Sequence, residues 1–570
     1  CIEPGEFVAL VGGSGAGKST LMGALSGFAR ATSGAVEVNG DDFYRHFDAY
    51  RSVVGYVPQD DIIHRMLPVA RALGYAARLR LPDDTAAHEI AQRITQVLRD
   101  VEMHAHQATL VNHLSGGQRK RISIGSELLA DPSLFFLDEP TSGLDPGLEK
   151  KMMYTLRRLA DGGRTVVLVT HATANIEQCD LVAFLAAGRL VYYGPPREAG
   201  QFFSVTSGDF ADIYTRIDGC FDANDPAFAS DAAMQQTYRT WQTTHQGAGA
   251  PPLLAELWEL RFRSSLYYRR YVQDRLDQSG AAARQSSAGA ATSSAARVSA
   301  WAQFTLLARR YSDLIIQDRR NLAILLLQAP LIAALLAGVV DAGAVSGSAA
   351  TFFTARAVMF MLAMVAVWFG IINAAREITK EATIYRRERL ANLRIGPYLF
   401  SKVVVLTGLI LIQSIMLLAI VGWKVHLPQA GVFTSAGIEL FLTTFLAGLA
   451  GLAMGLLIST IAATPDRAIS IVPLALIPQI ILSGVIFTLE GHAKLLSWLA
   501  VGRWAMDAYG TVINLNSLPA MMGGQPVTPP YDEYTHSAGH LLGRWLIMAL
   551  YTAVCLALTI WLLRRKDAKN

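Results

Sequence analysis

Residues 114–118 read Leu-Ser-Gly-Gly-Gln, and they lie between two further stretches that are typical of nucleotide binding. Upstream, residues 12–20 read Gly-Gly-Ser-Gly-Ala-Gly-Lys-Ser-Thr, which is a complete phosphate-binding loop. Downstream, residues 134–139 read Leu-Phe-Phe-Leu-Asp-Glu, which indicates an apolar strand ending in two acids. A phosphate loop alone occurs in many unrelated nucleotide hydrolases. The three stretches together, in this order, predict an α/β P-loop nucleotide-binding domain.

The glycine-rich loop follows an apolar strand at residues 7–11 and precedes a helix at residues 20–25, the context that a phosphate loop requires. Its glycines allow the backbone amides to point at phosphate oxygens. We expect Lys18 to place a positive charge on the β- and γ-phosphates of ATP, and Ser19 to offer a hydroxyl to Mg²⁺. The predicted nucleotide-binding residues of this loop are Gly12, Gly13, Ser14, Gly15, Ala16, Gly17, Lys18, Ser19 and Thr20.

The two acids that end the apolar strand are expected to have separate roles. Asp138 is expected to hold Mg²⁺, through a water molecule, and Glu139 to orient and polarise the attacking water. The alternative is that both acids merely mark the end of a strand. The sequence Pro-Thr-Ser-Gly-Leu-Asp at residues 140–145 disfavours that alternative.

The pentapeptide at residues 114–118 is expected to open a helix that continues to residue 129. A helix N-terminus presents unpaired backbone amides and a positive dipole end, which together favour an anion. The residues of this stretch predicted to bind nucleotide are Ser115, Gly116, Gly117 and Gln118.

The composition of the 570 residues conceals two different halves. Charged residues make up 17% of the chain and apolar residues 52%, but the long apolar runs begin only after residue 321. The net charge of +4 is small and gives no reason to expect a nucleic-acid partner. The four cysteines, Cys1, Cys179, Cys220 and Cys555, show neither metal-ligand spacing nor a disulfide framework.

Six apolar runs are each about 20 residues long, the length that a helix needs to cross a membrane. They are residues 322–340, 357–375, 403–423, 440–463, 468–487 and 545–563. Basic residues cluster before the first run, between the second and third, and after the sixth, which predicts that both ends of this region face the cytosol. The second half is therefore expected to be an all-α transmembrane domain with six helices, preceded by the nucleotide-binding domain.

The predicted boundaries place the nucleotide-binding domain at residues 1–225, a helical segment with a Ser/Ala/Gly-rich linker at 226–300, and the transmembrane domain at 301–570. Just before the first run, apolar residues recur at helical spacing and predict an amphipathic helix in the membrane interface, with a soluble packing helix as the alternative. Its apolar face contains Trp301, Phe304, Leu307, Tyr311 and Leu314, and its other faces contain Arg309, Arg310, Asp313 and Arg320.

Three features inside the apolar runs carry further expectations. Gly448, Gly451 and Gly455 are expected to allow close helix packing. Pro473 and Pro478 are expected to kink the fifth run. Glu439, at the external edge of the fourth run, is expected to lie in the interface and not to act as a proton relay.

The first half closely resembles the ATP-binding cassette family, on the three motifs quoted above. The resemblance implies further roles, residue by residue. Gln59 matches a glutamine that senses Mg²⁺ and touches the membrane domain, so it is expected to act in both catalysis and metal binding. Asp145 matches an aspartate at the seam between two cassettes. His171 matches a histidine that contacts the γ-phosphate. The expected catalytic residues are thus Glu139, His171 and Gln59, and the expected metal residues are Ser19, Gln59 and Asp138.

The order of the halves, cassette first, resembles the G (White-like) subfamily of half-transporters. Local matches are Gln303-Phe304 with Arg309, the charged stretch at residues 376–389 with Tyr398 and Lys402, and residues 503–508. The resemblance implies an ATPase coupled to export of an amphipathic or lipid-like substrate, using ATP and Mg²⁺. It also implies a second half-transporter, as in a homodimer, and membrane lipids as partners. The alternatives are an importer, or a regulatory ATPase that signals without transport.

The same resemblance implies that the second and fifth spans line a central cleft for cargo at the dimer axis. The residues that these spans offer are large and apolar. Not all of them can face the dimer axis, because successive residues lie about 100° apart on a helix. They are Phe360, Met361, Met364, Val367 and Trp368 in the second span, and Ile477, Ile480, Ile481 and Val485 in the fifth.

The charged stretch at residues 376–389 is expected to form a cytosolic helix that touches the cassette near Gln59. The long Ala/Ser linker resembles bacterial members, some of which carry forkhead-associated domains upstream, and this implies the bacterial inner membrane with a cytosolic cassette. The chain begins at Cys1 and not at Met, so we expect a true N-terminus upstream, together with the aromatic residue that stacks on adenine in this family.

Overall fold

A computed structural model describes residues 1–50, 53–171, 175–205, 210–222, 225, 228, 231–244, 252–278, 299–346, 351–391, 393–522, 525–526 and 534–569. The chain forms two compact units, one built from residues 1–298 with 390–392 and the other from residues 299–389 and 393–570. Almost all of the predicted Ser/Ala/Gly-rich linker, residues 279–298, lies outside the described residues.

The first unit is built on a six-stranded sheet in the order β4-β5-β6-β1-β7-β8. All pairs are parallel except β7 with β8, which is antiparallel. The central strands are apolar runs buried on both faces, as parallel strands covered by helices require. The strands are β1 (Phe7–Val11), β4 (Val54–Val57), β5 (Leu134–Asp138), β6 (Thr165–Val169), β7 (Leu181–Ala186) and β8 (Arg189–Gly194), and a separate hairpin joins β2 (Glu37–Val38) to β3 (Asp41–Asp42).

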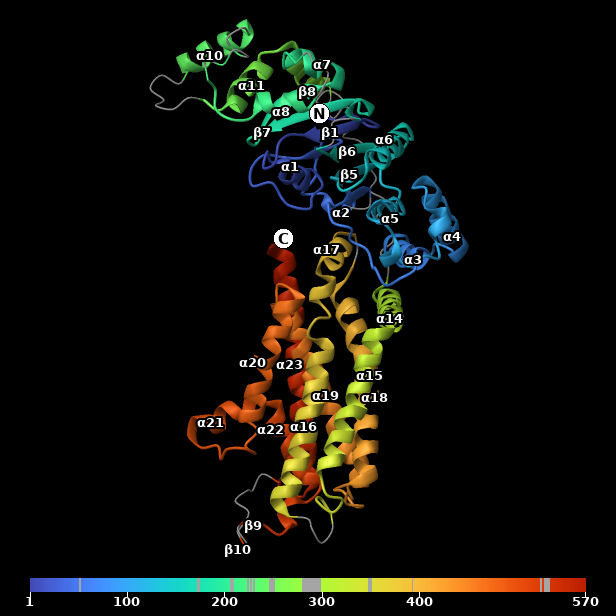
Figure 1. Ribbon diagram of the computed structural model, residues 1–570, viewed down its shortest axis with the longest axis vertical. Helices are drawn as coiled ribbons and strands as arrows, with labels where there is room; N and C mark the ends of the chain where they lie inside the picture. Colours follow the sequence, from blue (N-terminus) through green and yellow to red (C-terminus); the bar gives the residue numbers. More distant parts are fainter. Residues whose placement is uncertain are drawn as a thin grey trace. The chain divides into compact units, whose positions relative to one another are not determined.

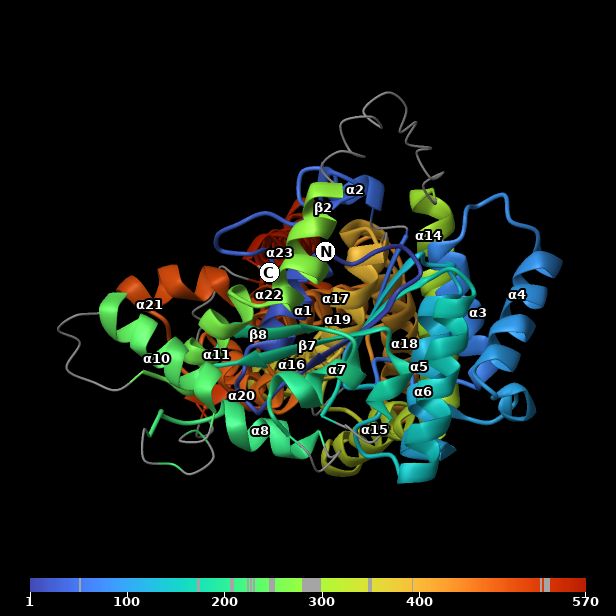
Figure 2. The ribbon, with the colours of Figure 1, turned by 90° about the horizontal axis from the view of Figure 1, so that it is seen from above.

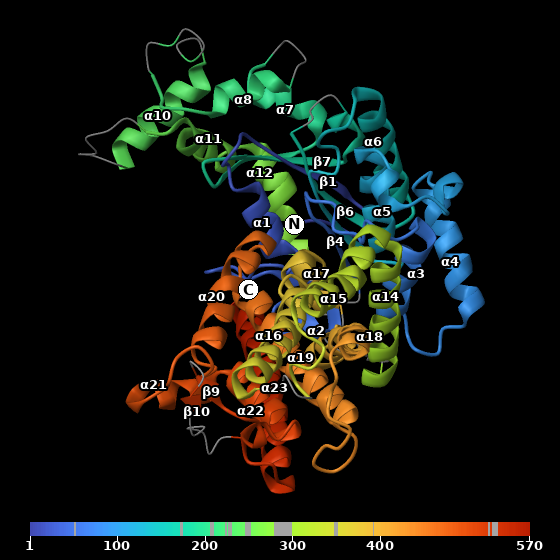
Figure 3. The ribbon, with the colours of Figure 1, turned by 60° about the horizontal axis from the view of Figure 1, so that its bottom comes forward.

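Helices flank this sheet. Helices α3 and α4 lie at one end of the unit, and α10 and α11 lie at the other (Figures 1 and 2). Figure 3 shows α3 and α4 beside α5. The helices are α1 (Lys18–Leu25), α2 (Phe47–Tyr50), α3 (Val69–Arg80), α4 (Ala87–Asp100), η1 (His104–His106), η2 (Val111–His113), α5 (Gly116–Leu128), α6 (Pro146–Asp161), η3 (Ile176–Gln178), α7 (Pro196–Phe202), α8 (Ala211–Ile217), α10 (Ala232–Thr244), α11 (Leu254–Arg263), α12 (Leu266–Tyr268) and the π-helix η4 (Arg269–Gln273).

The second unit is helical, and its long helices run side by side (Figure 1). The helices are α14 (Ala300–Gln317), α15 (Arg319–Val339), α16 (Phe352–Ala374), η5 (Thr379–Glu381), α17 (Ala382–Ala391), α18 (Ile395–Lys424), α19 (Ala436–Ile461), α20 (Pro465–Ile481), α21 (Gly491–Leu496), η6 (Ser497–Leu499), α22 (Val501–Val512), η7 (Leu515–Ser517) and α23 (Ala538–Lys569). Strands β9 (Met521–Met522) and β10 (Gln525–Pro526) pair before α23. The predicted fold class, an α/β P-loop domain followed by a helical membrane domain, is confirmed.

Among the described residues, five helices are long and apolar enough to cross a membrane. They correspond to five of the six predicted runs. The fifth predicted run, residues 468–487, instead forms α20, which has 17 residues and ends at Ile481. Leu482 is the C-cap of α20, and Gly484, two residues further on, adopts a φ of 76°, which lies outside the helical region. A helix of 17 residues is at the lower limit for a span, so six spans remain a prediction.

The three glycines of α19 allow close packing, Gly451 and Gly455 against α16 and Gly448 against Ile410 of α18. A Cβ added at Gly451 would lie 2.4 Å from the carbonyl oxygen of Val367, and one added at Gly455 would lie 2.6 Å from that of Ile371. On the facing helix, a Cβ at Gly370 would lie 2.1 Å from the carbonyl oxygen of Gly448. These distances are far below van der Waals contact, so the small-residue packing prediction is confirmed.

The side chain of Glu439 is buried within the protein at the start of α19, and its place in the membrane interface stays a prediction. The side chain is only 2% exposed. The carboxylate accepts hydrogen bonds from the backbone amides of Val432, Phe433 and Thr434, at 2.5–2.8 Å. Three charge-assisted bonds compensate for burying the charge. Glu439 therefore fixes the turn that leads into α19.

Replacing Gly451 with alanine should destabilise the helical unit. The added methyl group would force α16 and α19 apart, which typically costs about 1–3 kcal/mol. Gly437, on the same helix, has open space where a Cβ would stand, with nothing within 4 Å, so Gly437→Ala is the matched control. Thermal unfolding in detergent should show a lower midpoint for Gly451→Ala than for Gly437→Ala. Equal midpoints would contradict the close-packing account.

Candidate functional site

The candidate site lies where the parallel strands of the first unit end. Strands β1, β4, β5 and β6 run parallel, so their carboxyl ends share one edge of the sheet. The residues that follow these strands include the glycine-rich loop after β1 and Gln59 after β4. Glu139 follows β5, and His171 follows β6. The topology thus brings together residues that lie far apart in the sequence.

The glycine-rich loop has the conformation of a phosphate cradle. Gly15 and Gly17 adopt φ angles of 78° and 94°, which favour glycine. Helix α1 begins directly at Lys18, so its free amides face the loop. The Lys18 ammonium turns into the loop and donates to the carbonyl oxygens of Gly12 and Gly13 at 2.9 and 2.8 Å. Burial lowers the pKa of the Lys18 ammonium.

Ser19 and Asp138 converge from different elements. The Ser19 hydroxyl donates to Oδ1 of Asp138 at 3.3 Å. Burial raises the pKa of the Asp138 carboxyl, which indicates a cost for the charged form that a nearby cation would offset. A hydroxyl and a carboxylate at this separation are hard oxygen ligands of the kind that Mg²⁺ prefers. These two residues therefore fit a magnesium ion.

Glu139 is held between two predicted catalytic residues. Its Oε2 accepts from the Gln59 amide at 2.9 Å, and its Oε1 lies 2.8 Å from Nε2 of His171. Its backbone adopts a φ of 47°, which is uncommon for a residue with a side chain. Such strain is typical of functional sites, where the surrounding structure fixes it. The structure thus brings Gln59, Glu139 and His171 into one contact group.

The pentapeptide opens a helix, as the sequence predicts. Ser115 caps the N-terminus of α5, its hydroxyl accepting from the backbone amide of Gln118 at 3.3 Å. Gln118 reciprocates by accepting from the Ser115 amide at 3.0 Å, which completes a capping box. Asp145 caps α6 in the same way, accepting from the amides of Gly147 and Leu148. Ser115, Gly116 and Asp145 are exposed.

Comparisons with known proteins agree with this geometry. The family described as ABC transporter matches residues 1–142, and the family described as ABC-2 type transporter matches residues 302–510. The ABC transporter ATP-binding/permease protein Rv1747 of Mycobacterium tuberculosis is 32% identical over 97% of this chain. The chain is an ATP-binding cassette joined to an ABC-2 type membrane domain, homologous to the G-type half-transporters.

Two further relatives show which parts of the chain are similar to known proteins. The broad substrate specificity ATP-binding cassette transporter ABCG2 of Mus musculus is 26% identical over 94% of this chain and 81% of its own length. The ABC transporter G family member 14 of Arabidopsis thaliana is 38% identical over 35% of this chain. The chain spans 58% of the mycobacterial relative and 32% of the plant relative. Helices of membrane-spanning length make this cassette protein an integral membrane protein.

Lys120 is a cassette residue that sequence reasoning missed. It lies on α5 and is 5% exposed, and its ammonium donates to the carbonyl oxygens of Pro58 and Gln59 at 3.1 and 2.5 Å. Burial lowers the pKa of this ammonium. The contact ties the helix that begins with the pentapeptide to the segment that carries Gln59. Lys120 lies two positions after Gln118, but nothing in the spacing alone reveals this role.

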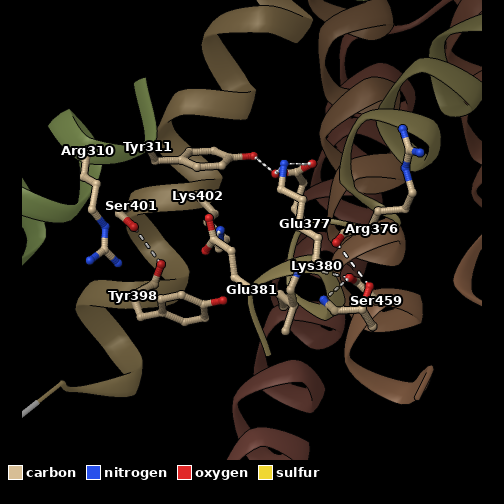
Figure 4. Close-up of polar contacts among 12 residues, drawn as sticks. Arg310, Tyr311, Arg376, Glu377, Lys380, Glu381, Tyr398, Ser401, Lys402 and Ser459 are labelled. Carbon is tan, nitrogen blue, oxygen red and sulfur yellow. Dashed lines mark hydrogen bonds and ion pairs between the residues drawn. The ribbon is translucent and has the colours of Figure 1, made fainter. Parts of the chain in front are cut away.

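A second cluster of charged side chains lies in the helical unit, on α14, on the segment that contains η5, and on α18 (Figure 4), and Glu388 adds α17 to it. The Lys402 ammonium lies 2.6 Å from a carboxylate oxygen of Glu381. The same ammonium lies 4.2 Å from the ring centre of Tyr311 and 5.1 Å from that of Tyr398. The Tyr311 hydroxyl donates to Glu377. Cation–π contact and ion pairing together compensate for burying the charge of Lys402.

Arg310 corrects the predicted pattern of α14. The sequence places it on a polar face, but its side chain is buried and donates to Glu388 of α17 with two bonds, at 2.5 and 2.9 Å. This two-pronged geometry is what a guanidinium and a carboxylate favour. Trp301, predicted on the apolar face of the same helix, is 73% exposed. The spacing of apolar residues predicts the apolar face of a helix, but it gives no sign of a charged residue that is buried in an ion pair.

Replacing Lys120 with methionine should slow ATP hydrolysis more than it weakens ATP binding. Methionine keeps the length of the side chain but loses hydrogen bonds from a charged donor, each worth about 1.5–3 kcal/mol. Gln59 would then lose one of its supports, and turnover should fall about tenfold or more. Lys150→Met, on the exposed side of α6, is the control. Steady-state turnover and ATP titration measure both effects. Unchanged turnover in Lys120→Met would contradict the positioning role.

Proposed function

We propose that this chain is one half of a dimeric ATP-driven exporter of amphipathic or lipid-like compounds. The observation that carries the ATPase part is the contact group of Gln59, Glu139 and His171 beside Ser19 and Asp138. In this group the Glu139 carboxylate is positioned to activate water, and Ser19 and Asp138, the pair that fits a magnesium ion, lie beside it. A structural strand end has no need of a strained backbone or of this convergence of polar side chains.

In this proposal the residues of the cassette bind and orient ATP. The loop amides and Lys18 hold the β- and γ-phosphates. Ser19 and Asp138 would hold Mg²⁺, assisted by Gln59. A bound Mg²⁺ would neutralise the negative charge that develops on the phosphates. Glu139 releases one of its two present partners and accepts a hydrogen bond from the attacking water.

The pentapeptide provides the argument for a dimer. The amides at the N-terminus of α5 suit an anion, and in the described part of the chain the Ser115 side chain bonds only to Gln118. By resemblance to the family, that anion is the γ-phosphate held by a second cassette. One chain then carries two halves of different sites, and a two-fold pair of chains completes both.

The cluster around Lys402 provides the argument for coupling. It joins α14, η5, α17 and α18 by ion pairs and buried aromatic contacts, so these elements should move as one body. We propose that α17 transmits cassette closure to the membrane helices through this cluster. A helix that is loosely packed against its neighbours would bend locally instead of moving them. Helices joined by buried ion pairs move together.

The exposed side chains of α16 and α20 support an apolar cargo path. Met361 and Trp368 of α16 are 50% and 48% exposed, and Ile477 and Ile481 of α20 are 51% and 43% exposed. Val367, one of the residues that the second span offers, is instead fully buried against α19. The exposed set is large, apolar and uncharged, which suits an amphipathic molecule better than a sugar or a metal ion.

Orientation and direction complete the proposal. Basic residues next to the predicted spans favour a cytosolic position for the cassette and for both ends of the membrane domain. The resemblance to bacterial members favours a bacterial inner membrane. Transport of a fluorescent lipid analogue into inverted vesicles supports export, and ATP-dependent loss from such vesicles supports an importer.

Replacing Glu139 with glutamine should abolish turnover without abolishing ATP binding. Glutamine keeps the size of the side chain but cannot polarise water, so hydrolysis should fall by orders of magnitude. ATP in the presence of Mg²⁺ should then trap closed dimers, measurable by size-exclusion chromatography of the detergent-solubilised protein. Near-normal turnover in Glu139→Gln would sink the proposed role of Glu139.

Truncating the exposed apolar residues should change how cargo stimulates turnover. Met361→Ala and Ile477→Ala should raise the concentration of an amphipathic drug or lipid that gives half-maximal stimulation, by several-fold, because each removes apolar contact area. Leu331→Ala, an exposed residue of α15, is the control. The measurement is ATPase activity in nanodiscs over a titration of stimulant. Stimulation by hydrophilic solutes alone would refute an apolar cargo path.

A further inference from the structure

The side chain of Gln118 is bonded at both of its ends. Its oxygen accepts from the backbone amide of Ser115 at 3.0 Å, and this bond is half of the capping box of α5. Its nitrogen lies 3.2 Å from Nε2 of His106, which belongs to the one-turn helix η1. The sequence gives no indication of this contact, because a histidine outside any motif carries no signal of its own.

The chemistry of the two groups allows only one arrangement. The amide oxygen must face the Ser115 N–H, so the amide NH₂ must face His106. Because NH₂ is a donor, Nε2 of His106 must accept, and the ring proton must sit on Nδ1. With the capping box in place, the bond between Gln118 and His106 therefore needs a neutral imidazole.

Protonation of His106 would place a second donor against the Gln118 NH₂. Turning the amide over would satisfy the imidazolium but would set NH₂ against the Ser115 N–H. Either way one bond is lost at the helix N-terminus. We propose that His106 is a positioning residue that, only when neutral, holds Gln118 and so keeps the pentapeptide ordered for the phosphate of the partner cassette. This inference rests on the proposed function.

Several charged groups in the segments around His106 are engaged with different partners. Helix α4 packs against η1, and α5 brings Gln118 to it. Glu102 lies 3.5 Å from Arg121, and Arg119 lies 3.8 Å from Asp61. Within the described residues, none forms an ion pair with His106. The start of α3 also bonds to the segment after η1. The titratable and charged residues of these neighbouring segments are Arg71, Arg99, Asp100, Glu102, His104, His113, Arg119, Lys120 and Arg121.

The expected consequence is a dependence on pH, because histidine is the side chain that changes charge between about pH 5 and 8. Loss of a helix cap weakens the ordered N-terminus enough to lower its population about three- to tenfold. At a pH where this imidazole is protonated, ATP turnover should therefore be lower by a similar factor. Other groups also titrate, so each variant is compared with the unaltered chain at the same pH.

Three substitutions at two positions separate the possibilities. His106→Gln offers an acceptor at the place of Nε2 and cannot gain a proton, so it should keep turnover at pH 8 and lose the acid-side decrease. His106→Arg offers only donors and should be slow at every pH. Gln118→Glu accepts from Ser115 and from an imidazolium together, so its turnover relative to the unaltered chain should rise as pH falls. His104→Asn, an exposed neighbour on η1, is the matched control and should follow the unaltered chain.

Hydrogen exchange of the full chain in nanodiscs gives a readout that needs no ATP. At pH 6 the amides of residues 115–118 should exchange several-fold faster in the unaltered chain than in His106→Gln, and at pH 8 the two should agree. Absence of any ATPase activity in the unaltered chain would remove the proposed function but leave this exchange test standing. An identical acid-side decrease in His106→Gln, normal turnover in His106→Arg at pH 8, or equal exchange at pH 6 would each overturn the role of His106.

Discussion

The parallel register of β1, β4, β5 and β6 is the constraint on which the cassette depends. Parallel strands deliver their carboxyl ends to one edge, so groups that lie far apart in the sequence meet there. Lys18 follows β1, Gln59 follows β4, Glu139 follows β5 and His171 follows β6. Because the strands are buried on both faces, a shift of register would disturb the core as well as the site. The sheet therefore positions the chemistry and stabilises the fold through the same apolar contacts.

Sequence reasoning located the parts of the fold that local patterns encode. Glycine spacing, the strand ending in Asp138 and the capping pentapeptide each have a short-range signal, and so do the glycines of α19. What it could not locate depends on contacts between distant segments. Lys120, His106 and Arg310 lie on helices whose spacing gives no hint of their partners, and Glu439 is buried by a turn that its own helix does not encode.

The helical unit combines two ways of holding helices together. Where α16 meets α19, small residues allow backbone contact, and dispersion over a close interface stabilises the pair. Where α14, η5, α17 and α18 meet, buried charges are matched one to one, with Lys402 on Glu381 and Arg310 on Glu388. Removing one partner of a buried ion pair strongly destabilises a protein, because the other charge is left buried without compensation. The first contact depends on shape and the second on charge, and we propose that the second transmits motion from α17 to the membrane helices.

The central claim of this account is that one chain supplies half of each of two ATP sites. Chains carrying Lys18→Ala and chains carrying Gly117→Glu should each be inactive alone, because each ruins both sites of its own homodimer. Mixed before assembly, they should form pairs in which one site contains both defects and the other contains neither. ATPase activity should then recover to about a quarter of that of the unaltered dimer. Failure of any mixing ratio to restore activity, in preparations shown to contain mixed pairs, would contradict the shared-site account.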